Sequence, residues 1–214
     1  MQISLSEFEQ KYAENELRIA FIGMSNIGKS YTASRLSERF NFDLIEVDKI
    51  IWEKLGQGSM ADFAAWQGQP YSEGYAEREA KSIALETEAT LSAIERPIGN
   101  AILDTTGSVI YTSDAVRAQL TKAWYIVHIQ ANMSDIDRLK TWYFENPKPL
   151  IWNGHFNQNP KEMDKDAILR CYPDLLQSRA RDYAKLADAK IGSEVILSPD
   201  LSIEEIFERL KPSL

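Results

Sequence analysis

A glycine-rich loop between an apolar segment and an amphipathic segment most constrains what this chain can fold into. Residues 23–30 read Gly-Met-Ser-Asn-Ile-Gly-Lys-Ser and fit the pattern G-x-x-x-x-G-K-[ST] at every fixed position. The fixed glycines let the backbone curve, which places successive N–H groups around phosphate oxygens. Residues 18–22 before the loop are predicted to form a buried strand, and residues 32–40 after it an amphipathic helix. A strand, this loop and a helix together predict a site for a nucleoside triphosphate.

The loop supplies most of the predicted nucleotide contacts. Lys29 is expected to reach the β- and γ-phosphates, and the Ser30 hydroxyl to bind Mg²⁺. The start of the following helix carries a partial positive charge that favours the same anion. The predicted nucleotide-binding residues of the loop are Gly23, Ser25, Asn26, Ile27, Gly28, Lys29, Ser30 and Tyr31.

Composition excludes several other classes of protein. The 214 residues suffice for one well-buried domain. The net charge of −8, from 24 basic and 32 acidic side chains, argues against a nucleic-acid surface. A single cysteine fits a reducing compartment, and residues 1–17 contain no apolar signal core. Because no apolar stretch is long enough to span a bilayer, we expect a soluble, cytoplasmic protein without a membrane partner.

Strand and helix patterns alternate along the rest of the chain. Further strands are predicted at residues 42–48, 101–104, 123–129 and 194–197. Helices are predicted at residues 74–95, 112–122, 134–144, 164–190 with a break at Pro173, and 202–210. This alternation is typical of an α/β fold with a parallel sheet and helices on both faces.

Carboxylates follow two of the predicted strands, at the edge where such sheets bind ligands. Asp104 is predicted to hold the waters of the Mg²⁺ that Ser30 binds, with Glu46 as a competitor for that role. Asp48 is predicted to orient or deprotonate an acceptor hydroxyl, as phosphoryl transfer requires. A turn residue at Asp104 and a helix cap at Asp48 remain the structural alternatives.

Two irregular stretches and several cations complete the predicted site. Residues 56–73 read as a loop with a short helical turn, and residues 142–156 combine two prolines with several aromatic side chains as a flap. Phosphoryl transfer needs added positive charge near the γ-phosphate, for which the candidates are Arg78, Lys148, and Arg179 or Arg181. Each of these cations could instead be an ordinary surface residue.

From about Arg18 to Leu210 these parts resemble the shikimate kinase family of small P-loop kinases. The glycine-rich loop and the Glu46-Val-Asp48 segment are the specific anchors of the resemblance. It implies a three-layer P-loop NTPase fold with a five-stranded parallel sheet in the order 2-3-1-4-5 and a lid. On this basis residues 1–214 form one kinase-like domain, with a substrate-binding region at about 49–96 and a lid at about 140–165.

The resemblance also assigns roles to residues outside the loop. It places Asp48 and the turn at Gly107 at the substrate, Lys148 in the catalytic lid, and Lys140 and Arg179 at the nucleotide. The family's substrate-carboxylate arginine falls on Ala76, and its triple-glycine turn on residues 105–108. Arg78 is a possible substitute for the missing arginine. Since a bidentate clamp for a carboxylate is absent at position 76, shikimate is a doubtful substrate.

We therefore expect a kinase that moves the γ-phosphate of ATP, with Mg²⁺, to a hydroxyl of another small molecule. The expected partners are ATP and a small hydroxylated acceptor, and the protein is expected to be a monomer or a homodimer. Two alternatives remain open. Asp104-Thr-Thr-Gly107 and Asn132-Met-Ser-Asp135 partly fit GTPase motifs, although the guanine motif needs Lys where Met133 stands. A non-catalytic ATP-binding regulatory protein would also carry the glycine-rich loop.

Overall fold

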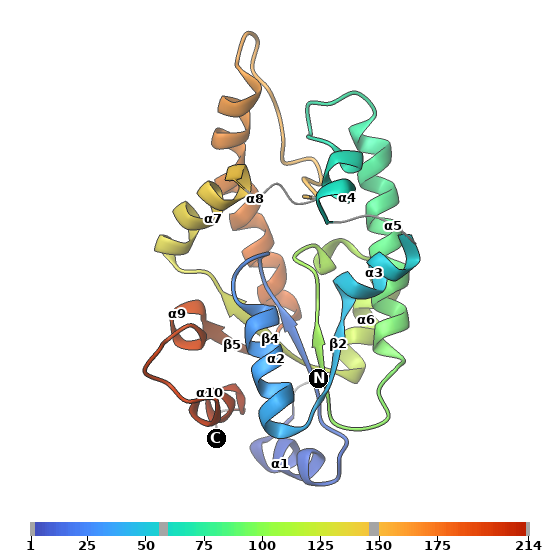
Figure 1. Cartoon of the computed structure of the whole chain (residues 1–214), viewed down its shortest axis with the longest axis vertical. Helices are drawn as coiled ribbons and strands as arrows, with labels where there is room; N and C mark the ends of the chain where they lie inside the picture. Colours follow the sequence, from blue (N-terminus) through green and yellow to red (C-terminus); the bar gives the residue numbers. More distant parts are fainter. Residues whose placement is uncertain (1–2, 56–59, 146–149, 213–214) are drawn as a thin grey trace.

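The computed structural model describes residues 3–55, 60–145 and 150–212 of the chain (Figure 1). At its centre lies a sheet of five parallel strands in the order β2-β3-β1-β4-β5. The predicted α/β fold and the strand order that the resemblance implies are both confirmed. The strands are β1 (Arg18–Ile22), β2 (Asp43–Glu46), β3 (Ala101–Asp104), β4 (Tyr125–Gln130) and β5 (Ala189–Gly192).

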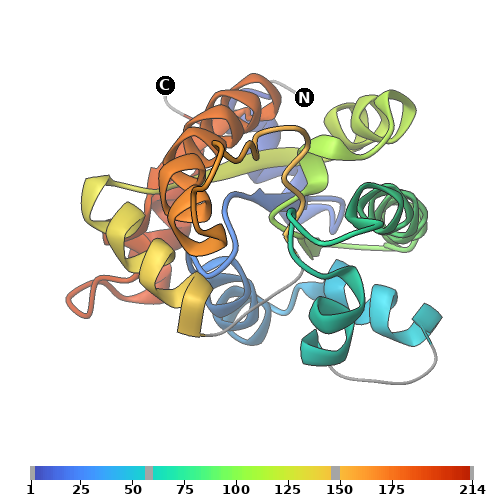
Figure 2. The ribbon, with the colours of Figure 1, turned by 90° about the horizontal axis from the view of Figure 1, so that it is seen from above.

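Helices cover both faces of the sheet. They are α1 (Leu5–Ala13), α2 (Lys29–Phe40), α3 (Val47–Leu55), α4 (Met60–Gln67), α5 (Tyr75–Ile94), α6 (Asp114–Ala123), α7 (Met133–Glu145), α8 (Asp164–Leu186), α9 (Ser193–Ile196) and α10 (Ile203–Leu210), with a 3₁₀ turn η1 (Val109–Tyr111). In Figure 2, α2 and α10 lie together on one face, and α5, α6 and α8 lie on the other. Among the described helices, none is both long enough and apolar enough to cross a bilayer.

The central strands are apolar because both of their faces are covered. Every residue of β3 is buried, and in β4 only the last residue, Gln130, is exposed. Between them, β1 is buried from Ile19 to Ile22. Burial on both faces favours continuous apolar runs over the alternation of a half-exposed strand. These runs are the pattern that predicted the strands.

The fifth strand lies earlier in the chain than predicted, so the prediction at residues 194–197 is wrong. Most of that segment belongs to the short helix α9, while β5 ends at Gly192. β5 is an edge strand in which Ile191 is buried and Lys190 is exposed. An edge strand needs few apolar residues, so β5 gives only a weak signal in the sequence. The apolar residue Ile196, which lies in the segment predicted as a strand, is buried in the short helix α9.

Two helical segments also differ from the prediction. The predicted break at Pro173 is wrong, because α8 runs from Asp164 to Leu186 with the proline inside it. Tyr172 and Leu175 beside the proline are buried, and this packing offsets the cost of about 3 kcal/mol that an interior proline imposes. Within residues 56–73 the predicted helical turn is the eight-residue helix α4.

A cluster of aromatic rings fixes the C-terminal helix to the body of the domain. The ring centroid of Phe207 in α10 lies 5.9 Å from Phe8, 5.6 Å from Tyr12, 4.4 Å from Phe40 and 6.0 Å from Phe42. These partners come from α1, from α2 and from the residue before β2. One side chain therefore joins three parts of the chain that are far apart in sequence.

We expect Phe207→Ala to lower the free energy of unfolding by about 3–5 kcal/mol, because it removes a buried ring and leaves a cavity. Urea denaturation followed by circular dichroism measures this loss. Ile98→Ala is the control, since Ile98 is 99% exposed and should change stability by less than about 0.5 kcal/mol. Equal effects of the two substitutions would contradict the role given to the cluster.

Candidate active site

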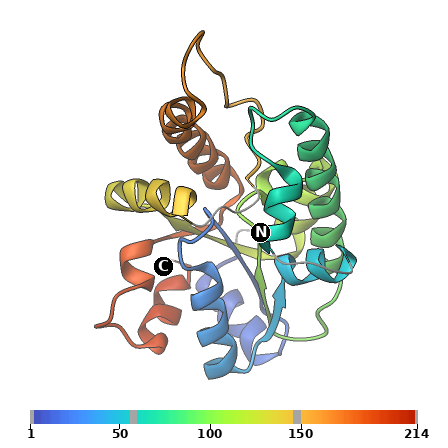
Figure 3. The ribbon, with the colours of Figure 1, turned by 45° about the horizontal axis from the view of Figure 1, so that its top comes forward.

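A cavity of about 380 Å³ opens where β1, β2 and β3 end. Figure 3 shows the loop after β1 between α7 on one side and α3, α4 and α5 on the other. Ligands of open α/β sheets bind at this edge, beyond the carboxyl ends of the strands. The cavity is lined by Ser25, Asn26, Gly28, Lys29, Ser30, Tyr31, Asp48, Ile51, Phe63, Gln67, Ser82, Glu86, Thr105, Thr106, Gly107, Ser108, Arg138, Trp142 and Ile151.

The backbone of the glycine-rich loop has the curvature that a phosphate site needs. Gly23, Asn26 and Gly28 have positive φ angles of 146°, 62° and 108°. A Cβ at Gly23 would lie 2.7 Å from the carbonyl oxygen of Ile129, so a larger residue does not fit there. α2 begins at Lys29, the seventh residue of the glycine-rich motif. The partial positive charge at the start of this helix therefore lies at the cavity.

Most of the loop residues predicted to bind the nucleotide line this cavity. Gly23 and Ile27 do not, and Ile27 is fully buried beneath the loop. The ammonium of Lys29 donates to the carbonyl oxygens of Gly23 at 3.1 Å and Met24 at 2.9 Å. Its charge therefore lies against the loop, at the place where the motif expects phosphate.

Arg138 of α7 is a second cation at the cavity, and the sequence reasoning missed it. Its guanidinium donates to the carbonyl oxygen of Asn26 at 3.2 Å and to the carboxylate of Asp135 at 2.7 Å. It thus holds α7 to the loop while lining the cavity. In the sequence, Arg138 could have been noticed because it lies three residues after Asp135 on the helix that leads into the predicted lid.

Three oxygen-bearing side chains beside the loop fit a magnesium site. Adjacent strands place Glu46 and Asp104 in register. Burial raises the pKa of Asp104, while the Lys29 ammonium and a hydrogen bond from Ser30 oppose the rise. Asp104 Oδ1 is buried and has no hydrogen-bond partner among the described residues, so a cation or its water could satisfy it.

The described residues hold no group of three or more His, Cys, Asp or Glu side chains that could bind a metal alone. Mg²⁺ keeps several waters and takes the rest of its ligands from one or two carboxylates and from phosphates. Ser30, Asp104 and Glu46 therefore remain the predicted metal set.

Asp48 reaches the cavity from a helix and not from a strand. β2 ends at Glu46, and α3 begins at Val47, so Asp48 lies in the first turn of α3. Its side chain lines the cavity together with Lys29, whereas Glu46 does not line it. The structure therefore brings the predicted base and the phosphate loop to one cavity.

Glu86 of α5 is the second acid at the cavity, and the sequence reasoning missed it entirely. Only 4% of the residue is exposed, and its carboxylate accepts hydrogen bonds from the hydroxyls of Thr106 and, at 2.6 Å, Ser108. Burial raises the pKa of Glu86 to about 7, with Asp48 adding to the rise and the two hydroxyls opposing it. The sequence could have indicated this residue, because Glu86 is a charged side chain on the otherwise buried face of α5.

Arg179 lies beneath the cavity and does not line it. The guanidinium is 2% exposed and donates to the carbonyl oxygens of Gly107 at 3.0 Å and Ile151 at 2.6 Å. It also lies over the ring of Tyr111, 5.3 Å from its centroid. Gly107 lines the cavity as predicted, and Arg179 holds it in place.

Two other predicted cations, Arg78 and Lys140, do not line the cavity. Arg78 donates to the carbonyl oxygens of Gln67 and Glu73, both at 2.9 Å. Lys140 lies on α7, 3.9 Å from the carboxylate of Asp137. Lys148, the predicted lid catalyst, falls outside the described residues.

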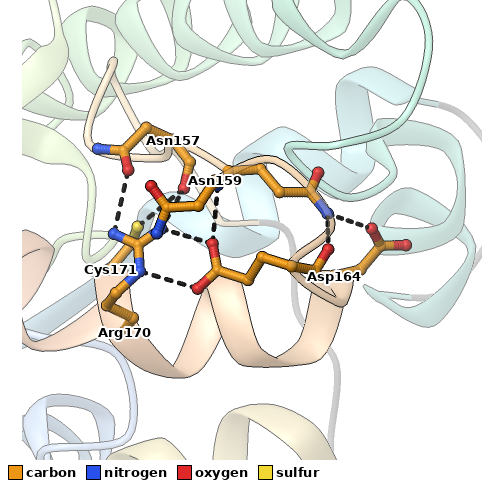
Figure 4. A network of polar contacts seen from close by, with 7 residues as sticks. Asn157, Asn159, Asp164, Arg170 and Cys171 are labelled. Atoms are coloured by element: carbon orange, nitrogen blue, oxygen red, sulfur yellow. Dashed lines mark hydrogen bonds and ion pairs between the residues drawn. The ribbon is translucent and has the colours of Figure 1, made fainter.

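Hydrogen bonds attach the second half of the predicted lid to the domain. Gln67 and Tyr75 both donate to the carbonyl oxygen of Leu150 at 2.7 Å, and the Trp152 N–H donates to Glu79 at 2.5 Å. Farther along, the guanidinium of Arg170 binds both the carboxylate of Glu162 and the main chain and side chain of Asn157 (Figure 4). This part of the lid is therefore tied to α4, α5 and α8.

Asn132 and Asp135, which suggested the guanine motif of the GTPase alternative, have a structural role. The Asn132 side chain accepts from the Asp135 N–H at 3.0 Å, and the Asp135 carboxylate accepts from the Asn132 N–H at 2.9 Å. These reciprocal bonds cap the start of α7. Asp135 also accepts from the hydroxyl of Ser193, and neither residue lines the cavity.

Solved structures share this arrangement across almost the whole chain. A shikimate kinase from Bacteroides thetaiotaomicron superposes with a TM-score of 0.61 at 18% identity, covering 91% of this chain and 96% of that one. Shikimate kinase from Acinetobacter baumannii in complex with shikimate gives 0.61 at 18%, with 92% of each chain covered. This chain has the fold of the shikimate kinases.

A shikimate kinase from Aquifex aeolicus gives a TM-score of 0.59 at 21% identity, covering 91% of this chain and 96% of that one. No family model matches the sequence, and no curated protein matches it. At these identities the likeness establishes a kinase-like P-loop fold, and the chemistry has to be argued from the site.

We expect Glu86→Gln to change how stability depends on pH. In the folded chain the pKa of Glu86 is about 7, above its ordinary value of 4.5, so between these values the folded state binds more protons than the unfolded state. This group therefore lowers stability as the pH rises from 4.5 to 7. The substitution removes that loss, so from pH 5 to pH 8 the variant should gain about 2.5 kcal/mol relative to wild type.

Urea denaturation at several pH values measures the difference. Glu88→Gln on the same helix is the matched control, because it makes the same change where 68% of the side chain is exposed, in a surface ion pair with Lys54. Parallel curves for wild type and Glu86→Gln would contradict the raised pKa.

Proposed function

We propose that this chain is an ATP- and Mg²⁺-dependent phosphotransferase that phosphorylates a hydroxyl of a small molecule. One observation carries the proposal: Lys29 and Ser30 of the glycine-rich loop share a single cavity with the carboxylate of Asp48 and a wall of polar side chains. A donor phosphate and an acceptor hydroxyl therefore fit within reach of the same groups. The kinase-like fold supports the proposal.

On the donor side, Lys29 and Arg138 provide the positive charge that phosphoryl transfer requires. The curved loop and the start of α2 bind the phosphates through backbone N–H groups. Ser30, Asp104 and Glu46 would hold Mg²⁺, which supplies charge neutralisation at the phosphates when bound.

On the acceptor side, Asp48 orients the hydroxyl and takes its proton. The hydroxyl oxygen forms the new bond to the γ-phosphorus as the bond to the departing ADP breaks. The proton moves to the Asp48 carboxylate, so charge and atoms balance. The wall formed by Ser82, Glu86 and the turn around Gly107 positions the rest of the acceptor.

We expect Asp48→Asn to lower acceptor-dependent ATP turnover by about 10²–10⁴-fold, because an amide cannot take the proton. Stabilisation by Mg-ATP in a thermal-shift assay should be unchanged, since the phosphate loop is intact. Asp43→Asn is the matched control: Asp43 is an exposed residue at the start of β2 and does not line the cavity.

Binding of Mg-ATP with no turnover by wild type on any hydroxylated acceptor would favour the regulatory alternative. A response to GTP and none to ATP would favour a GTPase. Full turnover by Asp48→Asn would remove Asp48 from the mechanism.

A further inference from the structure

The acceptor side of the cavity has an unusual polar wall. Its side chains come from α4, α5 and the turn after β3, and they carry hydroxyl, amide and carboxylate groups. They are Gln67, Ser82, Glu86, Thr106 and Ser108. Ile51, Phe63 and Ile151 complete this side with apolar surface.

The hydroxyl hydrogens of this wall are already used within it. Thr106 and Ser108 both donate to the carboxylate of Glu86. Ser82 donates to the amide oxygen of Gln67 at 2.7 Å, and the Gln67 amide nitrogen donates to the carbonyl oxygen of Leu150 at 2.7 Å. Since a hydroxyl has one hydrogen and two lone pairs, the hydroxyls of the wall have mainly lone pairs left to offer a ligand.

No described basic side chain lines the acceptor side of the cavity, although Arg179 lies behind it and partly opposes the rise that burial causes in the pKa of Glu86. Lys29 and Arg138 are the described cations that line the cavity, and both bind the loop backbone on the phosphate side. Arg179 donates to the carbonyl oxygens of Gly107 and Ile151, and Arg78 to those of Gln67 and Glu73. Within residues 3–55, 60–145 and 150–212, no basic side chain lines the acceptor side.

A wall of lone pairs and carboxylates selects for hydrogen-bond donors. A carboxylate or phosphate group on the acceptor would bring further lone pairs and negative charge to Asp48 and Glu86, and no described cation lines this side of the cavity to bind it directly. Hydroxyl and ammonium groups offer the hydrogens that this wall lacks. Desolvation at the buried Glu86 makes an unsatisfied partner there costly.

We propose that the phosphate acceptor is a polyol without an acid group, bound through its hydroxyl hydrogens to Glu86 and Ser82. The inference rests on the proposed function and names the substrate class of the same site. Asp48 receives the reacting hydroxyl, and Glu86 sets the selection against anionic acceptors.

Matched acceptor pairs that differ by an acid group test the inference. The pairs are glucitol with gluconate, galactose with galacturonate, and glycerol with glycerate, with glucosamine as a cationic member. ADP release is measured at pH 8 with saturating Mg-ATP, since above pH 7 Glu86 is mainly ionised. We expect the preferred neutral or amino member to have a kcat/KM at least about tenfold above that of its acid partner.

The Glu86→Gln variant tests the residue itself. It removes the negative charge and keeps the shape, so the preference for the neutral member should shrink by about tenfold while the KM for ATP stays unchanged. Glu88→Gln is the matched control and should keep the wild-type preference. If Glu86→Gln is poorly folded, the wild-type ratio still decides the question.

A preference of the wild-type enzyme for the acid members would overturn the inference, as would the absence of any response to the neutral and amino members. Its failure is distinct from that of the proposed function. If Mg-ATP neither stabilises the protein nor is turned over with any acceptor, the kinase proposal fails; if turnover occurs but favours acids, only the acceptor inference fails.

Discussion

The buried guanidinium of Arg179 connects the two loops on which the cavity depends. One nitrogen binds the carbonyl oxygen of Gly107 in the turn after β3, and another binds that of Ile151 in the lid. The hydroxyl of Tyr183, one turn later on α8, donates to the same Gly107 oxygen. Since a buried carbonyl without a partner is costly, these bonds fix both loops relative to α8. The turn after β3 and the lid segment at Ile151 are therefore both held by side chains of α8.

The same turn supplies the hydrogen bonds that the buried carboxylate of Glu86 accepts at the cavity. The fixed turn presents Thr106 and Ser108 to Glu86, and their hydrogen bonds favour the ionised form while burial favours the neutral one. The result is a buried acid with a pKa of about 7. A shift of this turn would change the hydrogen bonds to Glu86 and therefore the pKa of its carboxyl group.

Features encoded by neighbouring residues could be predicted from the sequence, and features made by tertiary contact could not. The loop at residues 23–30, the buried strands and Asp48 at the cavity follow from local patterns. β5 was misplaced because an edge strand needs only one apolar side chain such as Ile191. Arg179 was assigned to the nucleotide because a sequence gives no burial, and Glu86 was missed because its partners lie about twenty residues away in a turn.

The two halves of the cavity differ in how the chain builds them. The phosphate half comes mainly from the continuous segment 25–31, with Arg138 added from α7, so its pattern can be recognised in the sequence. The acceptor half takes side chains from α3, α4, α5 and the turn after β3, which are far apart in the sequence. Under the proposed function, substitutions on that side are expected to change the acceptor without disturbing the loop. A fold shared at 18–21% identity is therefore compatible with a different acceptor, and our proposal places the selection of that acceptor at Ser82 and Glu86.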